Sequence, residues 1–290
     1  MRKLVLPTIA SCPQPKANDT FLIGDMPTFA QRADQVPKDF WTRKNCAKGN
    51  DWTGGMSYDE AVTCTRTGDL SGVPASDAFL AKFESISPMR KAWGFQRNII
   101  GTSLDVGAYL ADSPTHMRRR VRSATHTAPL TVAVDLVSSG GVDSKHLVKR
   151  GALILALVRA LSISRPVELW AGGSATPSSK NGAWHVWFKI DTAPLDLARA
   201  AHVMTSTAVA RGMIYATISH EAGTGGGDLM WPYCDHTWSR ANMRPVLSRA
   251  FGADDMLTIA APHVKDRLVS EPEAWFKEML QQYGGIDHEA

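Results

Sequence analysis

Residues 129–161 read PLTVAVDLVSSGGVDSKHLVKRGALILALVRAL, and this stretch decides the fold. Its first part, 131–137, is a short β-branched and apolar run between a proline and a Ser-Ser-Gly-Gly turn, which is typical of a buried strand. Within 144–161 apolar residues recur at steps of three and four, which indicates a helix with one face in the core. Asp143 or Ser144 can cap its first amides. The stretch therefore predicts a buried strand, a turn and a long helix.

The alternation of strands and helices continues to the end of the chain. A second strand at 167–171 is separated from a third at 183–190 by a loop rich in Gly, Ser, Pro and Asn, so we expect these two strands to form a hairpin. The later elements are predicted as a helix at 195–211, a helix at 238–250, a strand at 256–260 and a helix at 273–282. This order predicts an α/β fold with an open, mostly parallel, doubly wound sheet.

The N-terminal part lacks this alternation. Five prolines interrupt the first fifty residues, which predicts an irregular arm lying on the body of the fold. A Ser-x-x-Glu capping box predicts a short helix over 58–65, and two more short helices fit 77–85 and 106–111. We therefore divide the chain into an N-terminal arm with a small helical segment, 1–128, and an α/β domain, 129–290.

Two observations give the chain a family resemblance. The predicted order, with a hairpin after the second strand, resembles a von Willebrand A-type domain. The segments 143–170, 52–57 and 104–110 are similar to an uncharacterised family of bacteriophage proteins. The resemblance implies a von Willebrand A-like fold and a phage lineage, and hence a protein at work in the cytoplasm of an infected bacterium.

The composition is that of an ordinary globular protein. The 290 residues are 44% hydrophobic and 21% charged, which argues against collagen-like, coiled-coil and disordered chains. No stretch approaches the roughly 18 uninterrupted apolar residues of a membrane-spanning helix, so we expect no membrane partner. The four cysteines lie far apart and form no Cys-x-x-Cys pair, which favours a reducing, cytoplasmic compartment. They are Cys12, Cys46, Cys64 and Cys234.

Positive charge is concentrated in one region. The formal net charge is only +4, yet residues 113–150 hold seven basic and two acidic residues. Guanidinium groups make bidentate contacts with phosphates, and the nine tryptophans offer faces on which bases can stack. A basic run is also ordinary on a solvated surface. We expect a nucleic-acid interface, for single-stranded DNA in particular, formed by Arg118, Arg119, Arg120, Arg122, Lys145, Lys149 and Arg150.

The turn after the first strand of the α/β domain carries a degenerate cation motif. In A-type domains an Asp-x-Ser-x-Ser turn holds a hard cation through oxygen atoms. Here the turn reads Asp135-Leu136-Val137-Ser138-Ser139, so Val137 replaces the first serine. Helix capping explains the same residue types without an ion. We therefore expect no cofactor, with a divalent cation at Asp135, Ser138 and Ser139 as the alternative.

Three functions follow from these features. The first is a phage-encoded, non-enzymatic nucleic-acid-binding accessory protein of transcription or replication, with a phage or host polymerase as a further partner. The second is an adaptor that binds another protein at the 138–143 edge of the sheet. The third is a metal- or thiol-dependent enzyme built on His220, Cys234 and His236, although their spacing matches neither HExxH nor a zinc finger. We take the first as the working expectation and name no catalytic residue.

Overall fold

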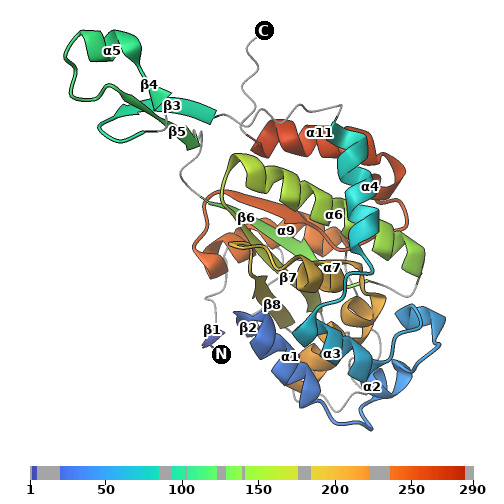
Figure 1. Cartoon of the computed structure of the whole chain (residues 1–290). Coiled ribbons are helices and arrows are strands. Elements are labelled where there is room, and N and C mark those ends of the chain that lie inside the picture. The colour runs from blue at the N-terminus through green and yellow to red at the C-terminus, as the bar shows by residue number, and fades with distance from the viewer. Residues whose placement is uncertain are drawn as a thin grey trace.

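The chain forms two separate sheets. The computed structural model describes residues 2–4, 20–84, 93–101, 103–122, 129–138, 141–175, 184–221 and 236–284. A six-stranded central sheet lies in the body of the molecule, and a three-stranded small sheet lies apart from it (Figure 1). Among the described residues, no helix combines the length and the apolar content that crossing a bilayer requires.

The central sheet consists of β1 (Arg2–Leu4), β2 (Thr20–Asp25), β6 (Leu130–Asp135), β7 (Val167–Ala175), β8 (Trp184–Ile190) and β9 (Met256–Ile259). Across the sheet the strands follow the order β1-β2-β8-β7-β6-β9. Neighbours are parallel at β2–β8, β7–β6 and β6–β9, and antiparallel at β1–β2 and β8–β7. The protein is thus a mixed α/β protein with a mostly parallel sheet, as the sequence predicts.

The strand and the helix predicted within 129–161 are confirmed as β6 and α6 (Ser144–Ser164), while residues 139–140 of the predicted turn lie outside the described residues. Every residue of β6 is buried. Asp143 is the N-cap of α6, because its Oδ1 accepts the backbone N–H of Lys145 at 2.8 Å. Gly151 lets α6 approach α7 (Leu197–Thr205) closely, since a Cβ at this position would lie 1.8 Å from the carbonyl oxygen of Met204.

Helices cover both faces of the central sheet. On one face α6 and α7 share a large apolar core with β6, β7 and β8. On the other face Trp187 of β8 packs with Met243 and Leu247 of α9 (His236–Phe251). The predicted hairpin is confirmed by the antiparallel β7–β8 pair, and Trp170 of β7 stacks on Phe251 with ring centroids 4.2 Å apart.

The N-terminal half contributes to the sheet, which the predicted irregular arm did not anticipate. β2 pairs in parallel with β8 and leads into α1 (Met26–Asp34), whose Phe29 stacks on Phe188 at 4.1 Å. A six-residue strand close to prolines offers too few positions for a periodic signal. The predicted capping box of Ser57 and Glu60 is confirmed at the start of α3 (Tyr58–Thr67). The remaining elements of this half are α2 (Trp41–Asn45), the 3-10 helix η1 (Asp51–Thr53) and α4 (Val73–Glu84).

The single helix predicted at 195–211 is divided. α7 ends at Ser206, whose backbone is extended, and the Ser206 Oγ accepts the N–H of Val209 at 3.3 Å. The π-helix η2 (Val209–Met213) and α8 (Ile214–Glu221) follow. The predicted last strand and last helix are confirmed as β9 and α11 (Pro272–Tyr283), with the short α10 (Arg267–Ser270) between them.

The small sheet contains β3 (Trp93–Asn98), β4 (Ser103–Leu104) and β5 (Met117–Arg122) in the antiparallel order β3-β5-β4. Between β4 and β5 lies α5 (Val106–Leu110), a predicted helix with Asp105 as its N-cap. The basic run is therefore a strand. No strand is predicted here from the sequence, because a run of arginines shows no apolar alternation. We call residues 93–122 the small-sheet module.

Candidate nucleic-acid interface

The basic strand β5 lies beside a strand that carries two aromatic residues. β5 and β3 pair at three alternate positions, and alternate positions along paired strands share one face of a sheet. The register pairs are Arg118 with Arg97, Arg120 with Phe95, and Arg122 with Trp93. The backbone therefore places four arginines and two aromatic residues on one face of the small sheet.

Asp105 joins the two arginines at one end of this face. Its Oδ2 accepts the Nε–H of Arg97 at 2.9 Å and two N–H groups of Arg118, from Nε at 3.2 Å and from Nη2 at 3.1 Å. Its Oδ1 accepts the backbone N–H of Ala108 at 3.2 Å and so caps α5. One carboxylate thus fixes two guanidinium groups side by side and ties them to a helix.

Together, Asp105, Arg97 and Arg118 carry a net positive charge. The pKa of the Asp105 carboxyl is lowered, chiefly by the N–H of Ala108 and further by the hydrogen bonds from Arg97 and Arg118, while desolvation opposes this shift. Asp105 is therefore a carboxylate at neutral pH. Its side chain is 7% exposed, whereas the Arg97 and Arg118 side chains are 62% and 48% exposed. The anion is buried beneath two cations that face solvent.

Short contacts hold the connection between α5 and β5. The backbone N–H of Asp105 donates to the carbonyl oxygen of His116 at 2.7 Å, and Nδ1 of His116 lies 2.8 Å from the carbonyl oxygen of Ser113. The His116 ring meets Tyr109 edge-on with centroids 5.4 Å apart. These contacts fix Asp105 and, through it, both guanidinium groups.

Large apolar side chains are also exposed on the small-sheet module. Among the described residues ten large hydrophobic side chains are exposed, and six of them belong to this module. Such a concentration is typical of a surface that contacts another molecule. The six are Ile99, Ile100, Leu104, Val106, Tyr109 and Leu110.

Three of the predicted arginines are placed by their backbone alone. Arg119, Arg120 and Arg122 belong to β5. Their side chains lie outside the described part of the structure. In the register of the sheet they pair with Gln96, Phe95 and Trp93 of β3.

The second predicted basic group lies at the start of α6 and is smaller than expected. Lys145 and Lys149 are exposed, and Nζ of Lys149 donates to the carbonyl oxygen of Val269 at 3.2 Å. Arg150 is only 2% exposed, contrary to the expectation of a surface contact. Its Nε donates to Asp266 Oδ2 at 2.9 Å, and its Nη2 donates to the carbonyl oxygen of Ala260. Arg150 therefore ties α6 to the segment after β9 and cannot reach a polyanion at the surface.

The two basic groups are not brought together. Arg118 lies on the small sheet, whereas Lys145 and Lys149 lie on a helix of the central sheet. Figure 1 shows these two sheets apart, with α6 packed on the body. The seven predicted residues therefore do not form one continuous basic surface.

The described residues that follow β6 are held by a local bond and by a bond from α8. Asp135 is 1% exposed, and its Oδ1 accepts the backbone N–H of Val137 at 3.0 Å. Ser138 is also buried, and its carbonyl oxygen accepts the hydroxyl of Tyr215 at 3.4 Å. Ser139 lies outside the described residues. A cation at Asp135, Ser138 and Ser139 thus stays a prediction, and the local bonds are those of a strand-ending turn.

The residues of the alternative enzyme centre are described only in part. His220 lies at the end of α8, and its ring meets Phe40 edge-on with centroids 6.4 Å apart. Cys234 and the side chain of His236 lie outside the described residues. The enzyme hypothesis therefore receives no geometric argument from this region.

Arg97 and Asp105 belong to the candidate interface but are not among the residues predicted from the sequence. The short helix predicted at 106–111 begins just after Asp105, but no local pattern indicates that Asp105 pairs with arginines that lie 8 and 13 residues away. A hairpin prediction over 93–122 would have aligned Arg97 with Arg118. The signal was weak, because β4 has only two residues and α5 interrupts the connection.

A family model described as a domain of unknown function, DUF7192, matches residues 13–254. No curated protein and no solved structure matches the chain.

Proposed function

The chain belongs to the DUF7192 family, and from its geometry we propose that it binds single-stranded nucleic acid through one face of the small-sheet module. The observation that carries this proposal is the group of Asp105, Arg97 and Arg118. A single buried carboxylate orients two exposed guanidinium groups and leaves them an excess of positive charge. Arginines held in this way lose little conformational freedom when they bind a phosphate.

Arg97 and Arg118 both have N–H groups that do not bond to Asp105 and can bind a ligand. Arg97 gives Asp105 its Nε–H, and Arg118 gives Nε–H and Nη2–H. The terminal nitrogens of Arg97 and Nη1 of Arg118 are therefore the donors that we assign to phosphate oxygens. Charged hydrogen bonds of this kind are about twice as strong as neutral ones.

Aromatic residues at the next register positions favour a single strand over a duplex. Trp93 and Phe95 occupy the alternate positions of β3 before Arg97 and pair in register with Arg122 and Arg120; the backbone alone places all four residues. Unpaired bases can stack on such rings while the backbone follows the arginines. In the whole module five arginines stand against two aspartates, so most of the chain's net charge of +4 belongs to these residues.

The start of α6 supports this function less well. Because Arg150 is buried and ion-paired, two lysines are left there. Two separated ammonium groups attract anions without fixing their orientation, whereas a guanidinium fork does both. We therefore assign the main contact to the small-sheet module, and to Lys145 and Lys149 at most a long-range electrostatic contribution.

The wider biological reading belongs to the same proposal. We propose a von Willebrand A-like arrangement for the part from β6 onward, supported by the parallel β6–β7 pair followed by the antiparallel β7–β8 hairpin. From the resemblance of segments 143–170, 52–57 and 104–110 we also propose a bacteriophage origin, and with it a role as a non-enzymatic accessory protein of phage transcription or replication. A polymerase is the further partner that such a role implies.

The test is a titration of labelled oligonucleotides followed by fluorescence anisotropy over a series of salt concentrations. We expect single-stranded DNA to bind more tightly than duplex DNA of the same sequence. Arg118→Ala should weaken binding and lower the log–log salt slope by about 0.7 for each lost phosphate contact. Arg66→Ala is the matched control, because Arg66 is 46% exposed and pairs with Asp34 at 2.8 Å on the body of the protein.

Two results would overturn the proposal. One is the absence of binding at low salt to either form of DNA. The other is an equal loss of affinity in Arg118→Ala and Arg66→Ala, which would point to net charge instead of a site.

A further inference from the structure

Three potential metal ligands converge between α3 and α7, far from the small sheet in the sequence. They are Cys64 on α3, Asp69 just after α3, and His202 on α7. One ligand atom of each, the sulfur, a carboxylate oxygen and a ring nitrogen, lies within 4.8 Å of the other two. Thiolate, carboxylate and imidazole are the ligand types from which protein zinc sites are built.

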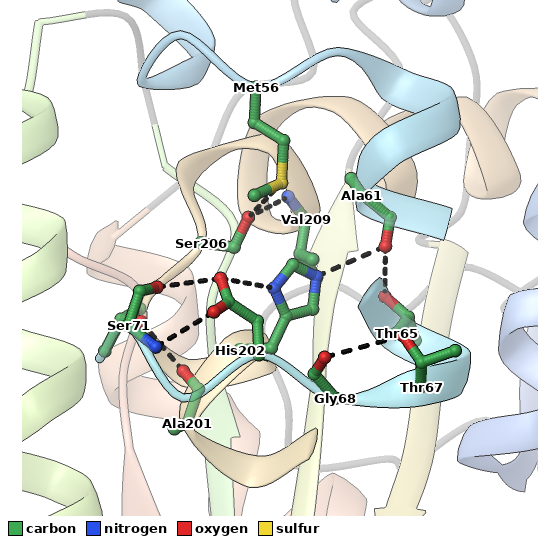
Figure 2. A network of polar contacts seen from close by, with 12 residues as sticks. Met56, Ala61, Thr65, Thr67, Gly68, Ser71, Ala201, His202, Ser206 and Val209 are labelled. Atoms are coloured by element: carbon green, nitrogen blue, oxygen red, sulfur yellow. Dashed lines mark hydrogen bonds and ion pairs between the residues drawn. The ribbon is translucent and has the colours of Figure 1, made fainter. Parts of the chain in front are cut away.

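The imidazole of His202 is held in the tautomer that a metal ligand needs. Its Nε2 lies 3.2 Å from the carbonyl oxygen of Ala61, which can only accept, so Nε2 carries the proton (Figure 2). Nδ1 then presents a lone pair toward Asp69, whose Oδ2 is 4.0 Å away. Histidines that bind a metal usually donate their other ring N–H to a backbone carbonyl or a carboxylate in this way.

The imidazole is enclosed and the Asp69 carboxylate is held in place. His202 is 1% exposed. The two Asp69 carboxylate oxygens accept the backbone N–H of Ser71, at 2.9 Å, and the Ser71 hydroxyl, at 2.7 Å. Figure 2 shows the His202 ring between Ser71 and Ala61. A lone pair therefore faces a carboxylate, an arrangement that a cation between them would stabilise.

The backbone holds the three side chains close to one another. Gly68 ends α3 with a φ of +87°, and a Cβ there would lie 2.6 Å from the Cβ of Ala198 on α7. The next residue, Asp69, donates its N–H to the carbonyl oxygen of Ala198 at 3.1 Å. The segment that carries Cys64 and Asp69 is thus bonded directly to the helix that carries His202.

We propose that Cys64, Asp69 and His202 bind one zinc-like divalent metal ion. Ligand atoms around tetrahedral zinc lie roughly 3.3–3.6 Å apart, given bond lengths of about 2.0–2.3 Å. The present spacing, within 4.8 Å, is longer than this range, so binding draws the three ligand atoms closer together. Cysteine binds metal ions as the thiolate, so the Cys64 thiol releases its proton to solvent as the ion binds.

Three protein ligands leave a fourth coordination position. Asp69 and His202 line a cavity of about 500 Å³, and its wall also includes Ser71, Thr205 and Ser206. The fourth position is expected on this side, where water or a small anionic ligand can reach the ion. The proposal is independent of nucleic-acid binding, since the residues belong to the body and not to the small-sheet module.

The test uses the full-length protein after treatment with a chelator. Titration with Co²⁺ should produce a thiolate-to-cobalt absorption band in the near ultraviolet that saturates at about one equivalent, and added Zn²⁺ should abolish it. Cys64→Ser should lose the band. Cys46→Ser is the matched control, because Cys46 is a free cysteine outside the cluster, and it should retain the band.

Further variants separate the site from general stability. Asp69→Asn should weaken metal binding without unfolding the chain, as judged by circular dichroism, and Ser71→Ala should weaken it about 10-fold through the orientation of Asp69. Zinc should raise the thermal midpoint of the unaltered protein but not of Cys64→Ser. The proposal is overturned if the folded protein gives no cobalt band, or if the band persists in Cys64→Ser.

Discussion

Arginine has opposite roles in the body of this protein and in the small-sheet module. In the body the Arg150 and Arg165 side chains are each 3% exposed, and each pairs with an aspartate, Asp266 and Asp255. In the small-sheet module Arg97 and Arg118 are 62% and 48% exposed and share the single Asp105. The body neutralises its cations to join segments of the fold, whereas the module keeps an excess of charge at its surface. Local charge in a sequence therefore does not by itself identify a binding surface.

Replacement of Arg150 should cause the largest loss of stability, because this buried arginine joins α6 to Asp266. Arg150→Met leaves Asp266 with an unbalanced charge and leaves two backbone carbonyls without their donor. Breaking a buried pair in this way costs about 3–5 kcal/mol. Urea unfolding followed by circular dichroism measures the loss.

Arg159→Met provides the comparison for this measurement. Arg159 pairs with Asp77, whose side chain is 55% exposed, so its loss should cost less than about 1 kcal/mol. Similar losses in the two variants would contradict the structural role of Arg150.

Glycine substitutions should separate the two regions by packing. Gly151→Ala places a Cβ against the carbonyl oxygen of Met204 and should cost about 1–3 kcal/mol through overpacking of α6 on α7. Gly107→Ala in α5 meets its nearest atom, Asp105 Oδ1, at 3.6 Å. This variant should be neutral or stabilise the helix by up to about 1 kcal/mol. Comparable destabilisation of both variants in thermal unfolding would refute the contrast in packing.

Acid should weaken the small-sheet module through Asp105. The pKa of this carboxyl is lower in the folded chain than its ordinary value of 3.8. Its contribution to stability is therefore complete above that value and is lost as the pH falls through the lower, folded value. NMR signals of the Arg97 and Arg118 Nε–H groups should shift together in that window, and Asp105→Asn should abolish the shared transition. Independent transitions of the two arginines would mean that Asp105 does not join them.

The order of elements in the body could be predicted because local periodicity determines it. β6, α6 and the β7–β8 hairpin follow from short-range patterns of apolar residues and turns. The burial of Arg150 could also be predicted, since Arg150 lies three residues after Leu147 and four before Ile154 on the apolar face of α6. The prediction of a surface contact for Arg150 depends on its charge alone and neglects its position on the helix.

The remaining features depend on contacts between distant segments. Asp105 meets Arg118 through the pairing of three short strands, and Asp69 meets His202 across 133 positions of sequence. β2 joins the sheet through β8, which follows it by more than 150 residues. No local pattern contains these pairings, so neither the full candidate interface nor the proposed metal ligands could be predicted from the sequence alone.

The most direct test of the account compares two double variants of the full-length chain in binding to a single-stranded oligonucleotide. Arg97→Ala with Arg118→Ala removes two charges from the small sheet, and Lys145→Ala with Lys149→Ala removes two charges from α6. We predict that the first pair lowers the log–log salt slope by about 1.4, as expected for two phosphate contacts, and that the second pair changes it much less. A larger loss in the α6 variant, or equal losses in both, would contradict the assignment of the interface to the small-sheet module.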